Sequence, residues 1–84
     1  MSYKVLLEKK AERELYRLPR KESQLLSETL DALESDPRPQ GARKLLVKGG
    51  YRLRKGRYRI LHTIDDAAKV VCVYRIGHRR EVYR

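Results

Sequence analysis

The spacing of apolar residues predicts a strand and then a helix at the start of the chain. Residues 3–7 (YKVLL) form a short apolar run ahead of a charged segment, which is typical of a buried strand. Within residues 8–18, Ala11, Leu15 and Leu18 recur at i, i+4 and i+7 with charged residues between them. This period predicts an amphipathic helix of about three turns.

A second helix is predicted after Pro19. Proline has no N–H to donate inside a helix but is tolerated in a first turn, so one helix can end there and another begin. Leucines at helical spacing continue to about Glu34. The segment that follows, residues 35–42 (SDPRPQGA), contains two prolines and a glycine and is predicted to be a loop. The two helices should form a hairpin.

From Tyr51 onward the apolar period changes to two, which predicts strands. Lys55 and Gly56 are predicted to form a two-residue turn, because glycine accepts a positive φ at little cost. A strand hairpin closed there has an arginine face and an apolar face. Arg54 would lie opposite Arg57, Arg52 opposite Arg59, Leu53 opposite Tyr58, and Tyr51 opposite Ile60.

The last two strands are predicted to join through a loop at residues 66–68, which would pair Asp65 with Lys69. In this register Arg59 faces Arg75, with Leu61, Val71 and Val73 beside them. The helix-packed face would hold Ile60, His62, Ile64, Val70, Cys72, Tyr74 and Ile76. The predicted class is α+β, a single domain over residues 1–84 in the order β-α-α-β-β-β. Its helical hairpin packs on one face of a mainly antiparallel sheet.

Length and composition exclude several classes of protein. The chain has 84 residues, enough for one modest core. Cys72 is the single cysteine, so an intrachain disulfide is excluded, and no metal-ligand spacing is present, so no metal or other cofactor is expected. No apolar run approaches the roughly 18 residues of a membrane span, and the N-terminal run is too short for a signal peptide. A soluble, cytoplasmic protein with no membrane partner is therefore expected.

The net charge of +10 is concentrated in the second half of the chain. Residues 1–40 contain eight basic and eight acidic side chains, whereas residues 41–84 contain thirteen basic and three acidic ones. Like charges directly opposite each other on a sheet destabilise it by roughly 0.2–1 kcal/mol per pair. An anionic partner would offset that loss, and arginine suits planar recognition of phosphate. The competing interpretation is a solubilising surface, although such surfaces usually mix both signs.

The C-terminal segment GHRREVYR, residues 77–84, adds candidate chemistry beside the basic face. Cleaving RNA without a metal needs a base for the ribose 2′-OH, cations around the phosphorane and a proton donor for the leaving 5′-oxygen. Tyr83 is a candidate base, since nearby guanidiniums favour its phenolate, and His78 is a candidate acid. Arginine does not readily deprotonate, so Arg59 and Arg79 are candidate charge stabilisers.

Structural roles compete with these chemical ones. The ring of Tyr83 would pack equally well on the core. His62 falls between Ile60 and Ile64 on the predicted core side and is expected to be structural rather than catalytic.

Two runs of residues resemble a known family. YRLRKGRYRILHTID (residues 51–65) and VVCVYRIGHRREVYR (residues 70–84) are similar to the RelE/ParE superfamily of bacterial toxins from toxin–antitoxin pairs, specifically its RelE branch. The opening YKVLLEKKAERELYRLP (residues 3–19) and the GGYRLR strand (residues 49–54) also resemble that branch. The resemblance covers essentially the whole chain, and GHRREVY is its most specific part.

The resemblance implies a ribosome-dependent endoribonuclease that enters the A site and cuts mRNA by metal-free attack of the 2′-OH. Translation then stops until a cognate antitoxin binds, in a toxin–antitoxin hetero-oligomer. By motif, Arg59, Arg79 and Tyr83 match the family's site, and Arg52 and Arg54 match a basic pair that is lysine in well-studied members. Further RNA-binding candidates on the same surface are Arg57, Arg75 and Arg80. Only Arg84 follows Tyr83, where several relatives continue into a helix that the antitoxin displaces.

Two other functions compete with the nuclease. A ParE-like gyrase inhibitor would share the fold without nuclease activity, and a plain RNA-binding module would bind without cutting. Leu61, Val71 and Val73, expected as apolar positions on the basic face, are candidate contacts either for the antitoxin or for an element that packs on the sheet.

Overall fold

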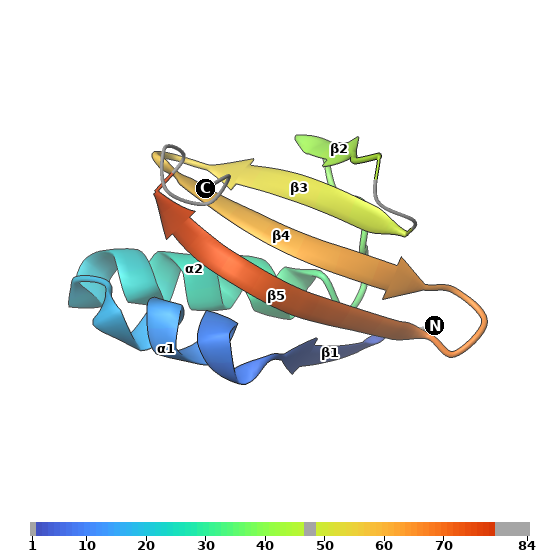
Figure 1. Cartoon of the computed structure of the whole chain (residues 1–84), viewed down its shortest axis with the longest axis horizontal. Coiled ribbons are helices and arrows are strands. Elements are labelled where there is room, and N and C mark those ends of the chain that lie inside the picture. The colour runs from blue at the N-terminus through green and yellow to red at the C-terminus, as the bar shows by residue number, and fades with distance from the viewer. Residues whose placement is uncertain (1, 47–48, 79–84) are drawn as a thin grey trace.

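A computed structural model describes residues 2–46 and 49–78, and its two helices lie together on one side of a five-stranded sheet (Figure 1). The strand order is β1-β5-β4-β3-β2, with β1 parallel to β5 and the other neighbours antiparallel. The predicted α+β class is confirmed. The elements are β1 (Lys4–Leu7), α1 (Lys9–Arg17), α2 (Arg20–Ala32), β2 (Ala42–Lys44), β3 (Gly50–Lys55), β4 (Tyr58–Asp65) and β5 (Val70–His78).

The core lies between the helices and one face of the sheet. The predicted apolar stripe of α1 is confirmed, because Ala11 and Leu15 are buried and Leu18 packs against the core. Helix α2 begins directly after Pro19, as its sequence predicts, and buries Leu26 and Leu30. Burying each such leucine contributes about 1.5–3 kcal/mol to folding. Neither α1 nor α2, the helices of the described part of the chain, has the length and apolar content that crossing a membrane requires.

The β3–β4 hairpin has a register two residues away from the predicted one. Arg54 pairs with Arg59 and Leu53 pairs with Ile60, so the turn residues are Gly56 and Arg57. Gly56 has φ +60°. The predicted turn would have needed a left-handed conformation at Lys55, which costs a lysine more than a glycine. Side chains alternate with a period of two, so this slip left Arg52, Arg54 and Arg59 on the predicted arginine face and left the apolar face unchanged. Arg57, predicted for the arginine face, lies in the turn instead.

The predicted β4–β5 register is wrong by one residue near the turn. The loop is one residue longer, with Lys69 at φ 58°, and Val70 rather than Lys69 pairs with Asp65. Val71 and Val73 are therefore fully buried on the helix-packed face. Their alternating neighbours Val70 and Cys72, predicted for that face, lie on the opposite one.

A bulge between Leu61 and His62 restores the predicted faces toward the end of β5. Val73 pairs with His62 and Arg75 pairs with Leu61, so Tyr74 is the extra residue. Beyond the bulge Ile76 pairs with Ile60 on the helix-packed face, and both side chains are buried. Arg59 consequently lies opposite Gly77, and the predicted pairing of Arg59 with Arg75 is corrected.

The sequence patterns did not predict strand β2. It follows the Pro-rich loop, and Gly41, with φ +98°, lies immediately before it. Ala42 pairs with Leu53 and packs against the core, whereas Arg43 pairs with Arg52. A three-residue strand is too short to show a clear period, so its position became visible only through its pairing with β3.

Candidate nucleic-acid interface

Arginines line the sheet face opposite the helices in two neighbouring rows that cross the strands. Arg52 and Arg54 alternate with the buried Leu53, which places them on this face. The row nearest the β3–β4 turn comprises Arg54, Arg59 and Gly77, and the next row comprises Arg43, Arg52, Leu61 and Arg75. We call the set Arg43, Arg52, Arg54, Arg59 and Arg75 the arginine face.

The three arginines of the β3–β4 hairpin strands differ in how much of their side chains is exposed to solvent. Arg59 is only 5% exposed, Arg52 is half-buried and Arg54 is exposed. Burial restricts the rotamers of a long side chain, so less conformational entropy remains to be lost when an anion binds. Arg59 is therefore the most preorganised cation of the arginine face, and Leu61 beside it, 6% exposed, is also buried.

Arg75 is the member of the arginine face whose charge α1 offsets. Its Nε donates to Oε2 of Glu14 at 3.1 Å, and both side chains are 19% exposed. Oε1 of the same carboxylate accepts the backbone N–H of Ile76 at 2.8 Å. The contribution of Arg75 to an anion site is thus reduced by an internal ion pair.

The remaining predicted residues lie at the margin of the sheet or beyond the described residues. Arg57 is exposed in the β3–β4 turn. His78 pairs with Tyr58, and their rings meet edge-on with centroids 6.2 Å apart. Because Tyr58 packs against the core, alternation places His78 on the helix side of the sheet margin. Arg79, Arg80 and Tyr83 lie outside the described residues.

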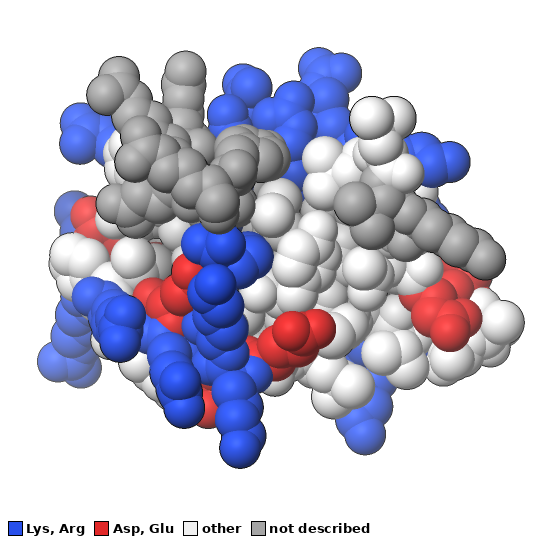
Figure 2. All heavy atoms as spheres, viewed as in Figure 1, with Lys and Arg blue, Asp and Glu red and all other residues white. Residues whose placement is uncertain are grey.

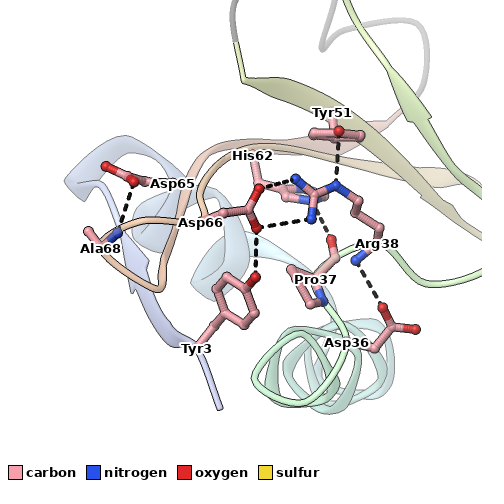
Figure 3. Close-up of polar contacts among 9 residues, drawn as sticks. All are labelled: Tyr3, Asp36, Pro37, Arg38, Tyr51, His62, Asp65, Asp66 and Ala68. Carbon is pink, nitrogen blue, oxygen red and sulfur yellow. Dashed lines mark hydrogen bonds and ion pairs between the residues drawn. The ribbon is translucent and has the colours of Figure 1, made fainter. Parts of the chain in front are cut away.

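A basic residue that the sequence analysis did not single out, Arg38, belongs to a separate cluster (Figure 3). Its guanidinium donates to both carboxylate oxygens of Asp66, at 2.7 and 3.2 Å, and to the hydroxyl of Tyr51 at 2.9 Å. Tyr3 also donates to Asp66, at 2.6 Å. These contacts tie the Pro-rich loop to β3, to the β4–β5 loop and to the residue before β1.

Charge and hydrogen bonding in this cluster shift the acidity of its members. The hydrogen bonds from Arg38, and then from Tyr3, lower the pKa of Asp66 to about 2. The same contact with Asp66 raises the pKa of Arg38 further above its ordinary value. The charge of Arg38 is thus paired with Asp66 within the molecule. Only the spacing of Arg38 and Asp66 in two loops was visible in the sequence, and that spacing alone predicts no contact.

His62 occupies the core, as its sequence position predicts. It is fully buried, and its ring stacks on Tyr51 with centroids 6.0 Å apart. Its Nε2 lies 3.2 Å from the carbonyl oxygen of Pro37, to which it donates when neutral. Burial lowers the pKa of His62, which favours that neutral form. Among residues 2–46 and 49–78, no three His, Cys, Asp or Glu side chains gather closely enough to hold a metal ion.

Comparisons with known proteins agree on one family. The model of the family described as the ParE toxin of the type II toxin–antitoxin system parDE matches residues 5–83. Toxin RelG of Mycobacterium tuberculosis is 33% identical over an alignment of 87 positions, which covers 100% of this chain and 99% of the relative.

Solved structures show the same fold. The archaeal RelE–RelB complex from Pyrococcus horikoshii OT3 contains a chain with a TM-score of 0.85 and 29% identity, and the match covers 96% of this chain and 99% of that one. The toxin–antitoxin complex RelBE2 from Mycobacterium tuberculosis gives a TM-score of 0.81 and 28% identity, covering 94% of this chain and 100% of that one.

Proposed function

Because the chain belongs to the RelE/ParE superfamily of toxins from type II toxin–antitoxin systems, we propose that it is a ribosome-dependent endoribonuclease. It would cut mRNA in the A site and so inhibit translation. The observation that carries this proposal is the arginine face. Its two rows end on β5, and β5 leads directly into the segment that contains Arg79 and Tyr83.

The proposed reaction needs no metal or other cofactor. The ribose 2′-oxygen attacks the neighbouring phosphorus, and the bond from phosphorus to the 5′-oxygen breaks. Tyr83 as its phenolate accepts the 2′-OH proton, and the leaving 5′-oxygen takes a proton from water. The predicted acid role of His78 is not carried into this proposal, because alternation places its side chain on the helix side of the sheet, away from Arg59. Arg59 and Arg79 stabilise the negative charge that develops on the phosphorane. The residues proposed to hold the RNA are Arg52, Arg54, Arg57, Arg75 and Arg80.

The composition of this site also explains why the ribosome would be required. Arginine keeps its proton at neutral pH, so proton transfer depends on few groups and the acid–base power of the site is weak. Holding the 2′-oxygen, the phosphorus and the 5′-oxygen in line would then supply much of the rate. We therefore expect free RNA to be cut poorly, and strong cleavage of free RNA would contradict the proposed dependence.

The same proposal includes a cognate antitoxin, which binds the toxin in a hetero-oligomer in the cytoplasm. Support comes from the similar RelE–RelB and RelBE2 structures, which are complexes of that kind. Of the three apolar positions predicted as antitoxin contacts, Val71 and Val73 are fully buried under the helices. Leu61 lies on the arginine face but is only 6% exposed, so the prediction of an exposed apolar contact surface at these three positions is corrected.

The direct test compares wild-type protein with Arg79→Ala and Tyr83→Phe after induction in cells. Growth arrest and codon-positioned mRNA cuts on ribosomes are measured, with the exposed Arg20→Gln as a matched control. We expect both site variants to lose cleavage and the control to keep it. Unchanged toxicity in both site variants would reject their assigned roles. RNA that is bound but recovered intact from translating ribosomes would indicate a binding module instead.

A ParE-like gyrase inhibitor is the second candidate function, because the matching family model is the one described as ParE toxin. Induction would then produce a DNA-damage response before protein synthesis falls. Pulse labelling of protein synthesis and a reporter of DNA damage, followed in the same culture, separate the two functions. The nuclease proposal requires that protein synthesis falls first.

A further inference from the structure

Arg43 extends the arginine face onto a strand that the sequence did not reveal. It lies in the middle of β2 and pairs directly with Arg52 of β3. Its neighbour Ala42 packs against the core, so alternation places Arg43 on the face opposite the helices. Arg43 is exposed and Arg52 is half-buried, so an anion can reach both guanidiniums from solvent.

Arg43 and Arg52 belong to the row that continues through Leu61 to Arg75. The positive charge of this row that no carboxylate offsets is concentrated at its β2–β3 end. At the other end, the ion pair with Glu14 offsets the charge of Arg75, and Leu61 in between is apolar. Within the described residues, no carboxylate forms an ion pair with Arg43 or Arg52. Figure 2 shows Lys and Arg atoms gathered along the margin of the sheet at β2 and β3, at the top of the view.

The geometry points to a phosphate-binding subsite formed jointly by Arg43 and Arg52. Two cations directly opposite each other on a sheet repel, and one phosphate between them would remove that repulsion. The planar guanidinium fork suits two oxygens of such a group. Arg54 and Arg59 form the adjacent row, so this subsite would hold the phosphate of a nucleotide that flanks the cleaved bond. The choice of RNA as the ligand rests on the proposed function.

The test measures binding without cleavage. A fluorescent single-stranded RNA oligonucleotide with 2′-O-methyl groups is titrated with protein at several salt concentrations, because a blocked 2′-oxygen cannot attack. For single strands, each neutralised phosphate contributes about 0.7 to the slope of log affinity against log salt. The variant Arg43→Gln/Arg52→Gln should lower the magnitude of that slope by about 0.7. Between about 50 and 200 mM salt, the factor by which its affinity falls should then be about 2.6 times smaller than for wild type.

The controls separate a shared site from a general loss of positive charge. Arg17→Gln/Arg20→Gln removes the same charge at exposed positions beside the turn between the helices, and it should leave the slope unchanged. If one phosphate is shared, the affinity loss of the Arg43→Gln/Arg52→Gln variant is smaller than the product of the two single losses.

Three results would overturn the subsite. These are a wild-type slope in the Arg43→Gln/Arg52→Gln variant, an equal slope change in the helix control, and no binding of the oligonucleotide by wild-type protein at about 50 mM salt. Failure of the proposed function looks different. Ribosomal mRNA would stay intact with wild-type protein, whereas the difference in slope between the two double variants would persist.

Discussion

Glu14 of α1 holds Arg75 of β5 through an ion pair of 3.1 Å and holds the next residue through a hydrogen bond of 2.8 Å to the backbone N–H of Ile76. Strand β1 pairs with β5 only as far as Val73, so beyond that point the edge of β5 faces α1. The carboxylate satisfies an N–H that an edge strand would otherwise leave open. Helix α1 thereby fixes the strand that leads to the candidate catalytic segment.

Replacing Glu14 should destabilise the fold. In Glu14→Ala, the partly buried guanidinium of Arg75 and the N–H of Ile76 both lose a partner, which should lower the free energy of unfolding by about 1–3 kcal/mol. Glu14→Gln keeps one acceptor oxygen and should fall between alanine and wild type. Urea denaturation measures all three, with the exposed Glu28→Ala expected within about 0.5 kcal/mol of wild type. A Glu14→Ala midpoint equal to that of the control would contradict this role.

Arg59 should matter for turnover more than for assembly on the ribosome. Removing one preorganised charge stabiliser typically lowers kcat by about 10² to 10³, and this is the loss expected for Arg59→Gln. Arg59→Lys retains the charge without the planar fork and should lose less. Single-turnover cleavage on programmed ribosomes measures the rate. Because Arg59 is buried, its replacement could unfold the protein, so thermal unfolding of each variant is measured alongside the cleavage rate. A folded Arg59→Gln protein that cleaves at the wild-type rate would reject the role.

Asp66 should make the stability of the protein dependent on pH in the acid range. Its pKa falls from 3.8 to about 2 in the folded state, chiefly through the hydrogen bonds from Arg38. The folded protein therefore binds this proton less readily than the unfolded chain, and the stability from Asp66 is complete above the unfolded value. It is lost as pH falls from about 4 toward 2. Asp66→Asn should lose less stability over that interval, as measured by urea denaturation at each pH. Parallel pH profiles for the two proteins would be the contrary result.

The turn at Gly56 should resist substitution for a backbone reason alone. A Cβ at this position would meet no atom within 4 Å, but φ is +60°. Gly56→Ala should therefore destabilise the fold by about 1–2 kcal/mol, whereas Gly56→Asn should cost less, since asparagine visits this conformation more readily. In thermal unfolding, the wild-type protein should have the highest melting temperature, Gly56→Asn an intermediate one and Gly56→Ala the lowest. An alanine variant as stable as wild type would show that the hairpin can adopt another turn.

The pattern of residues was enough to assign both helices, the strands β1, β3, β4 and β5, and the faces of the hairpin. Apolar periods of 3.6 and two are local properties, so they survive an error in register. The hairpin illustrates this, because its true register differs by two residues while Arg52, Arg54 and Arg59 keep their predicted face. The core position of His62 followed from the same alternation.

Which residues become neighbours depends instead on backbone conformations in turns and on contacts between distant segments. The left-handed conformations of Gly56 and Lys69, together with the bulge at Tyr74, set the strand registers. Glu14 reaches Arg75 across 61 positions of sequence, and Arg38 reaches Asp66 across 28. No local period encodes such contacts, because their free energy exists only once the helices and the sheet have packed together. Folding thus leaves the cations of β2 and β3 facing solvent, while Arg38 and Arg75 are paired within the molecule.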